Sequence, residues 1–386
     1  MAAMITTPRL MAIGGGALAE LPNVMARFGL TKPLIVTDPF LVSSGHLDCA
    51  TAQLDRAGIR WEVFSDTVAD PTTDVIETGA ARLAAGAFDS LVAIGGGSSI
   101  DTAKAMSVLN ANGGKMRDYK VPADIPRAGP PLVAIPTTAG TGSEVTRFTV
   151  ITDTETDEKM LIAGLACCPI AGIVDYELTL TMPLRLTADT GLDSLTHAIE
   201  AYVSRRANPY TDGLAKNAMG LIARHIRTAC AEPGNRPARE AMMLGATTAG
   251  MAFSNASVCL VHGMSRPIGA FFHVPHGLSN AMLLPEITAF SAPAALERYA
   301  DCARAMGIAE EGEGSQSAAA RLLDELRRLN KDLTVPSPRA WGIDAARYEE
   351  LLPVMASQAL ASGSPGNNPR VPTSEEIIDL YRRVYG

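Results

Sequence analysis

The stretch SLVAIGGGSSIDTAK, Ser90 to Lys104, decides the fold that the sequence predicts. Its apolar run at 90–94 is typical of a buried strand, it stops at three glycines, and a helical pattern follows over 99–109. A glycine-rich turn between a strand and a helix exposes backbone amides at the positive end of the helix, where a phosphate can bind. The alternative is a plain turn, because a glycine triplet is a weak signal and another occurs at 14–16.

Short apolar runs alternate with helical patterns through the first half of the chain. Besides 90–94, strands are predicted at 32–38, 59–64 and 131–136, and helices at 73–85 and from Pro39 through Leu54. Strands and helices that alternate in this way form a parallel sheet with helices on both faces. We therefore expect an α/β, Rossmann-like domain of the kind that binds nucleotides, although a fold alone fixes no function.

Two further features of this half fit a dinucleotide. The loop from Pro136 to Thr146 follows a predicted strand and offers hydroxyl and amide donors to a pyrophosphate or ribose; otherwise it is a long polar loop. Asp38 ends another strand, where its carboxylate can accept hydrogen bonds from a ribose diol and would repel a 2′-phosphate. This favours NAD over NADP, although an aspartate at the end of a strand is also a common turn residue.

Two stretches of the second half carry candidate metal ligands. They are DSLTHAIEAYV at 193–203 and VHGMSRPIGAFFHVPHG at 261–277. Residues four apart on a helix share a face, so Asp193 and His197 can offer an oxygen and a nitrogen to one point. With His262 and His276 they form a ligand set of one aspartate and three histidines. The alternative for the first pair is an ordinary hydrogen bond on the face of a helix.

Composition and charge exclude several classes of function. The chain has 386 residues, 47% of them hydrophobic, and its 33 Lys+Arg against 41 Asp+Glu give a net charge of −8. No basic run could neutralise a line of phosphates, so we expect no nucleic-acid partner. The sequence has neither a run of about 20 apolar residues nor a signal-peptide pattern, and its six cysteines form no Cys-x-x-Cys pair. We expect no membrane partner and a cytoplasmic protein with reduced thiols.

Four motifs together resemble the iron-containing (group III) alcohol dehydrogenases of the dehydroquinate synthase-like superfamily. They are GGGSSIDTAK at 95–104, IPTTAGTGSEVT at 135–146, TGLDSLTHAIEAY at 190–202 and VHGMSRPIGAFFHVPHGLSNAMLLP at 261–285. A weaker match, GNNPRVPTSEEIIDLY at 366–381, extends the resemblance almost to the C-terminus. The resemblance therefore covers most of the chain, and its motifs occur in the expected order.

The resemblance implies a fold and a set of site residues. It implies an α/β NAD-binding domain at 1–183 and an all-helical metal-binding domain at 184–386; strand-like runs end near Met182. The family's metal ligands fall on Asp193, His197, His262 and His276. Its cofactor contacts fall on Asp38, Gly96, Gly97, Ser98, Asp101, Thr137, Thr138, Thr141 and Ser143, with Lys159 as a further contact.

The resemblance also implies a reaction. We expect a metal-dependent, NAD-linked alcohol dehydrogenase or aldehyde reductase, in which hydride passes between an alcohol and nicotinamide while the alkoxide is bound to a divalent metal. Four protein ligands would fill a tetrahedral zinc, whereas Fe²⁺ accepts five or six, so iron is favoured and Zn²⁺ remains possible. The expected partners are a small alcohol or aldehyde and further copies of the chain, in a homodimer or larger homo-oligomer.

Two residues of the third motif are candidates for a catalytic role. Where many members of the family carry a histidine, four residues after His262, this chain has Arg266. A guanidinium offers a planar fork of donors to a carboxylate or phosphate, so Arg266 would favour acidic or strongly polar aldehydes, or else replace a proton relay. The alternative is a salt bridge on the surface or at the interface between the domains. His273 could relay a proton to solvent or be a bystander.

Other classes of function share these features. A dehydroquinate synthase-like lyase would use the same fold, NAD and metal but would regenerate its cofactor within one turnover. A hydroxyacid-oxoacid transhydrogenase would need an oxoacid acceptor in place of free NAD. A non-catalytic scaffold would have no structural need for all four candidate metal ligands.

Overall fold

The computed structural model describes residues 2–386, which divide into two compact units. One unit is Met4–Thr181, and the other contains Met182–Gly386. The first is built on a parallel sheet and the second is helical, so the predicted α/β and all-helical parts are confirmed. Among the described residues no single helix is long and apolar enough to cross a membrane. The helices α8 (Arg236–Ala256) and α9 (Leu260–Phe272) reach that length and apolarity only together, as a pair bent by 104°.

The sheet of the N-terminal unit has six parallel strands in the order β1-β8-β5-β4-β2-β3. The strands are β1 (Leu10–Ile13), β2 (Pro33–Val36), β3 (Glu62–Phe64), β4 (Ser90–Gly95), β5 (Leu132–Pro136) and β8 (Ala171–Val174). The apolar runs predict the strands β2, β3, β4 and β5, and β3 is shorter than the predicted 59–64. A separate antiparallel hairpin is formed by β6 (Phe148–Asp153) and β7 (Glu158–Ala163).

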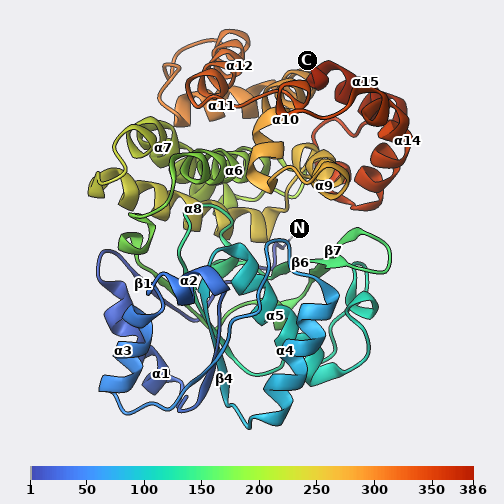
Figure 1. Ribbon diagram of the computed structural model, residues 1–386. Coiled ribbons are helices and arrows are strands. Elements are labelled where there is room, and N and C mark those ends of the chain that lie inside the picture. Colours follow the sequence, from blue (N-terminus) through green and yellow to red (C-terminus); the bar gives the residue numbers. More distant parts are fainter. Residues whose placement is uncertain (1) are drawn as a thin grey trace. The chain divides into compact units, whose positions relative to one another are not determined.

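Helices cover both faces of this sheet, as the apolar runs require. The helices are α1 (Leu21–Arg27), α2 (Pro39–Ser43), α3 (Asp48–Arg56), α4 (Thr73–Ala85) and α5 (Gly97–Asn112). Val92 and Ile94 of β4 pack in one core cluster with α1 and α3, whereas Leu91 and Ala93 pack in another with α4 and α5. Figure 1 shows α1 and α3 on one side of β4 and α4 and α5 on the other.

One predicted helix of this unit is wrong in its length. The helical pattern from Pro39 through Leu54 is two helices, α2 and α3, because the chain turns between them at Gly45. The φ of Gly45 is 75°, a left-handed conformation that glycine adopts without a steric penalty and that interrupts a right-handed helix.

The C-terminal unit consists of helices (Figure 1). They are α6 (Leu184–Val203), α7 (Pro209–Ala231), α8 (Arg236–Ala256), α9 (Leu260–Phe272), α10 (His276–Ser291), α11 (Leu296–Ala305), α12 (Ser315–Asp332), α13 (Pro338–Trp341), α14 (Ala345–Ala361) and α15 (Ser374–Tyr385). Helix α6 packs against α7, α8 and α10, and α10 also packs against α9. The helices that carry the candidate metal ligands are therefore neighbours in the core of this unit.

Candidate functional site

Helix α6 carries two candidate ligands toward the interior of the C-terminal unit. Asp193 and His197 are 2% and 4% exposed, and His197 Nε2 lies 3.9 Å from Asp193 Oδ1. The ring of His197 stacks on Phe253 of α8 at a centroid distance of 4.2 Å, which fixes the orientation of the imidazole. The spacing of four residues thus places both polar groups on the buried face of the helix, as the sequence predicts.

The other two histidines come from the starts of neighbouring helices. His262 lies in the first turn of α9, and His276 is the first residue of α10. The start of α10 comes very close to α6, because a Cβ at Gly277 would lie 2.4 Å from the carbonyl oxygen of Asp189. Only glycine allows this approach, which explains the glycine that follows His276 in the motif.

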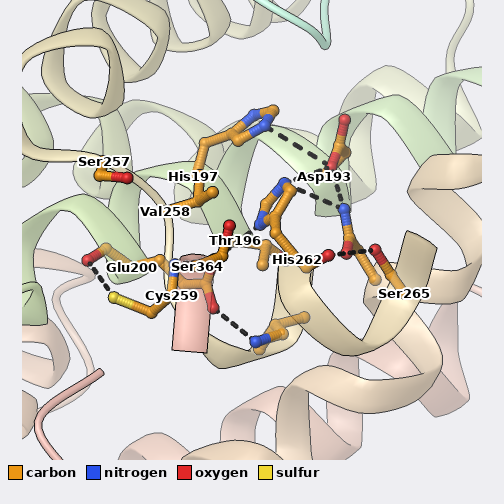
Figure 2. Close-up of polar contacts among 12 residues, drawn as sticks. Asp193, Thr196, His197, Glu200, Ser257, Val258, Cys259, His262, Ser265 and Ser364 are labelled. Atoms are coloured by element: carbon orange, nitrogen blue, oxygen red, sulfur yellow. Dashed lines mark hydrogen bonds and ion pairs between the residues drawn. The ribbon is translucent and has the colours of Figure 1, made fainter. Parts of the chain in front are cut away.

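The donor atoms are spaced as ligands of one ion would be. Asp193 Oδ1 lies 3.5 Å from His262 Nε2 and 3.9 Å from His276 Nε2 (Figure 2 shows Asp193, His197 and His262). Two ligands bound at about 2.1 Å and roughly 110–120° apart are separated by roughly 3.4–3.7 Å. The ligand atoms of Asp193, His262 and His276 all lie within 4.8 Å of one another. His197 is outside this group of three, although its Nε2 lies 3.9 Å from the same oxygen of Asp193.

Glu200 of α6 orients His262, although it is absent from the predicted ligand set. Its Oε2 accepts a hydrogen bond from His262 Nδ1 at 2.6 Å, which leaves Nε2 to face Asp193. The same carboxylate accepts the backbone N–H groups of Cys259 and Val261, at 2.9 and 2.7 Å. It therefore satisfies amides at the start of α9 and makes the imidazole a stronger donor to a cation. Its position seven residues after Asp193, on the same helix face, is a sequence signal that could have found it.

Asn280 is the second residue of the site that the motifs do not single out. It follows His276 by one helical turn in α10 and is fully buried. Its amide nitrogen lies 2.6 Å from Asp193 Oδ1. The spacing of four residues from a predicted ligand was the available signal.

The charges of the cluster suit a cation. Burial alone would raise the pKa of Asp193, but the facing His197, His276 and His262 outweigh it and hold that pKa well below its usual range. Burial would lower the pKa of His262, yet Glu200 and Asp193 together raise it. The cluster therefore combines a carboxylate whose charged form is favoured with an imidazole of raised basicity. Such donors fit Fe²⁺ or Zn²⁺.

The structure places the two catalytic candidates differently. Arg266 lies one helical turn after His262 in α9, and its Nη1 donates a hydrogen bond to Ser364 Oγ at 3.0 Å. Burial lowers the pKa of Arg266 to about 10, which still leaves the guanidinium charged at neutral pH. His273 is exposed and ends α9 with a left-handed φ of 54°.

The predicted cofactor loops meet at the carboxyl edge of the parallel sheet. Thr137 N donates to the carbonyl of Gly95 at 2.9 Å, and a Cβ at Gly97 would lie 2.7 Å from Thr141 Cγ2. Gly96 precedes α5 directly, beside Thr138, and Ser98 lies in the first turn of that helix. These residues form one surface at a helix N-terminus, where a pyrophosphate can bind.

The remaining predicted cofactor residues have partners within the protein. Asp38 caps α2 by accepting from Leu41 N at 3.0 Å. Asp101 accepts from Ser143 Oγ at 2.6 Å and from Val150 N at 2.9 Å, and Lys159 pairs with Asp70 at 2.9 Å. Asp101 and Ser143 thus hold the second loop and the β6–β7 hairpin against α5.

Lys104 lies beneath these loops and supports them. Its ammonium is 1% exposed and donates to Ser143 Oγ, to the carbonyl and hydroxyl of Thr146 and to the carbonyl of Phe148, at 2.8–3.1 Å. A buried ammonium needs such partners because its desolvation is costly.

Known proteins of one family are similar to this chain over almost its whole length. A sequence profile described as "Iron-containing alcohol dehydrogenase" matches residues 8–176, and one described as "Fe-containing alcohol dehydrogenase family, C-terminal" matches 187–385. The chain is 38% identical to lactaldehyde reductase of Escherichia coli over 374 residues, 96% of this chain and 97% of that protein. It is also 38% identical to NAD-dependent methanol dehydrogenase of Bacillus methanolicus over 377 residues, 98% of each. A crystal structure of 1,3-propanediol oxidoreductase superposes with a TM-score of 0.95, at 35% identity and full coverage of both chains.

Replacing Glu200 with glutamine is expected to weaken Fe²⁺ or Zn²⁺ binding about 10–100-fold, because His262 loses the carboxylate that orients it and raises its basicity. A chelator-competition titration measures this affinity. The matched control is Glu325→Gln, which changes another buried glutamate of the same unit that pairs with Arg227. Equal affinities in the parent and the Glu200 variant, or an equal loss in both variants, would contradict the role of Glu200.

Proposed function

Because the chain belongs to the iron-containing alcohol dehydrogenase family, we propose that it interconverts an alcohol and an aldehyde at the Asp193–His262–His276 cluster, with a preference for anionic or strongly polar substrates. The predicted family, the NAD-linked alcohol dehydrogenase or aldehyde reductase activity, and the dependence on NAD and a divalent metal are confirmed by the similarities above. The observation that carries the assignment to this cluster is the convergence of its donor atoms within 4.8 Å.

The protein's own groups prepare the reaction in this proposal. A bound divalent ion supplies Lewis acidity and the nicotinamide accepts or returns the hydride. Asp193, His197, His262 and His276 supply the donors for that ion. Glu200 holds the tautomer of His262 through a 2.6 Å hydrogen bond. His276, with a side chain 37% exposed, is the most accessible of the four, which favours approach of substrate from its side.

The NAD site in this proposal is the carboxyl edge of the parallel sheet. Gly96, Gly97 and Ser98 offer close backbone approach at the start of α5, and Thr137, Thr138 and Thr141 face them from the next loop. Asp38 lies two residues after β2, the neighbour of β4, and its carboxylate would select the ribose diol of NAD. Asp101 and Ser143 keep the second loop in position, and Lys159 contributes from the β6–β7 hairpin.

Arg266 is the residue that would select the substrate. Among residues 2–386 no carboxylate lies within ion-pair distance of its guanidinium, and the hydroxyl of Ser364 is its hydrogen-bond acceptor. A guanidinium has five N–H donors, so most of its capacity is available to a ligand. A carboxylate or sulfonate near the reacting carbon fits this fork, and the missing ion pair favours substrate recognition over a structural salt bridge.

His273 has two properties that bear on proton transfer. Its side chain is exposed, and it lies three residues before His276. We propose that it passes a proton between the site and solvent. Replacing it with asparagine removes the imidazole and tolerates the left-handed backbone; unchanged turnover across pH 6–9 would exclude the relay.

We further propose that the enzyme works in the cytoplasm as a homodimer or larger homo-oligomer. All six cysteines are free thiols, which fits a reducing compartment. Size-exclusion chromatography with light scattering measures the assembly.

The activity is tested by the absorbance at 340 nm with NAD⁺ and a panel of primary alcohols, diols and hydroxyacids, on metal-free protein reloaded with Fe²⁺ or Zn²⁺. Net NADH formation that depends on the metal is expected. Turnover that requires an oxoacid acceptor would favour a transhydrogenase. Absence of net NADH with every alcohol, and of NADH oxidation with aldehydes, would contradict the dehydrogenase.

Arg266→His is expected to lower kcat/KM for an anionic aldehyde such as succinic semialdehyde about 10–100-fold and to leave butanal nearly unchanged. A charge-assisted hydrogen bond contributes about 1.5–3 kcal/mol, which corresponds to this range. Arg382→His, on the exposed side of α15, is the control. An unchanged preference for succinic semialdehyde over butanal would exclude Arg266 as the selecting residue.

A further inference from the structure

The side chain of Asn280 lies against the ligand atoms of the candidate metal cluster. It is 0% exposed, and α10 places it one turn after His276. Its Nδ2 lies within hydrogen-bonding distance of three candidate metal-ligand atoms: Asp193 Oδ1 at 2.6 Å, His262 Nε2 at 3.1 Å and His276 Nε2 at 3.3 Å. These are the same three atoms that form the cluster.

In this orientation of the amide, the nitrogen has more neighbours than it has hydrogens, and the oxygen has no hydrogen-bond donor in the described part of the chain. A carboxamide nitrogen carries two hydrogens, but it lies beside Asp193 Oδ1 and two imidazole nitrogens, which are acceptors when the imidazoles are neutral and Nε2 is unprotonated. On the other side, Oδ1 of Asn280 is buried and meets no hydrogen-bond donor among the described residues. An unsatisfied buried carbonyl costs about 1–3 kcal/mol, so a partner for this oxygen is expected.

A half-turn of the last torsion exchanges the oxygen and the nitrogen of an amide, which differ little in shape. After that turn Oδ1 would face Asp193 Oδ1 and, in the neutral tautomers that bind a metal through Nε2, the lone pairs of the two imidazoles. Three acceptors around a fourth repel one another unless a cation lies among them. The turned amide is therefore stable together with a cation, which Oδ1 would then help to bind.

The distances also match a ligand position. Two ligands about 90° apart, each about 2.1 Å from one ion, are separated by about 3.0 Å. The terminal atom of Asn280 lies 2.6–3.3 Å from its three neighbours, so it holds the place of an adjacent ligand in a shell of five or six. Amide oxygens are hard donors, which suit Fe²⁺.

We propose that Asn280 is a further metal ligand, which donates through Oδ1 beside Asp193 and the three histidines. This inference rests on the metal-dependent function proposed above. A neutral fifth donor raises the coordination number above the four of a tetrahedral site and favours iron over zinc, while one position is left for substrate. If the amide instead only donates hydrogen bonds to the ligands, it is a positioning residue and not a ligand.

The test uses metal-free protein titrated with Co²⁺, whose visible bands intensify when its coordination number falls to four, and with Fe²⁺ by anaerobic chelator competition. Asn280→Ala is expected to lower affinity about 10–100-fold and to strengthen the Co²⁺ bands. Asn280→Asp restores an oxygen donor and is expected to keep the weak bands of the parent. The matched control is Asn330→Ala, because Asn330 donates to the carbonyl of Ala281 at 2.7 Å and so contacts the same helix away from the donors.

The outcomes separate the inference from the function on which it rests. A parent protein that binds neither metal would contradict the metal-dependent function and Asn280 with it. A parent that binds metal while Asn280→Ala keeps its affinity and spectrum would overturn only the role of Asn280. Weaker binding with an unchanged Co²⁺ spectrum would make Asn280 a positioning residue and overturn the ligand assignment. Far-UV circular dichroism and thermal unfolding without metal verify that each variant is folded.

Discussion

The buried charge of Asp193 is the constraint on which the C-terminal unit depends. An ionised carboxylate that is 2% exposed is costly unless cationic or hydrogen-bonding groups surround it. Those groups come from three helices, His197 from α6, His262 from α9 and His276 from α10, and they require the helices to converge. Gly277 permits this convergence because a Cβ there would collide with Asp189. The packing of the helical core and the spacing of the donors therefore have one cause.

Glu200 of α6 holds the start of α9, directly after the segment that joins α8 to α9. One carboxylate accepts from two backbone amides at the start of α9 and from His262. Since α6 carries both Asp193 and Glu200, the direction of α9 and the orientation of its histidine are set by the same helix. In the N-terminal unit Lys104 likewise joins separate segments with one buried charge. Its ammonium binds both the loop that contains Ser143 and the start of the β6–β7 hairpin.

Much of this arrangement could be predicted from the sequence. The strands β2, β3, β4 and β5 follow from short apolar runs, α4 from a helical pattern, and the shared face of Asp193 and His197 from a spacing of four residues. The family, fold class, NAD and metal dependence are confirmed. Local sequence patterns do not predict the break of the helix at Gly45 or the short strands β1 and β8, because each depends on contacts distant in sequence. Glu200 and Asn280 are not among the predicted site residues because a buried glutamate or asparagine has no motif of its own, although both lie at helical spacing from a candidate ligand.

One divalent ion is expected to bind where Asp193 and the three histidines converge. Anaerobic calorimetric titration of metal-free protein with Fe²⁺ tests it most directly, in the parent, in Asp193→Ala and in His225→Ala, which removes an imidazole of α7 outside the cluster. One ion per chain is expected in the parent and in His225→Ala, and no saturable binding in Asp193→Ala. Equal binding in all three proteins, or none in the parent, would contradict it.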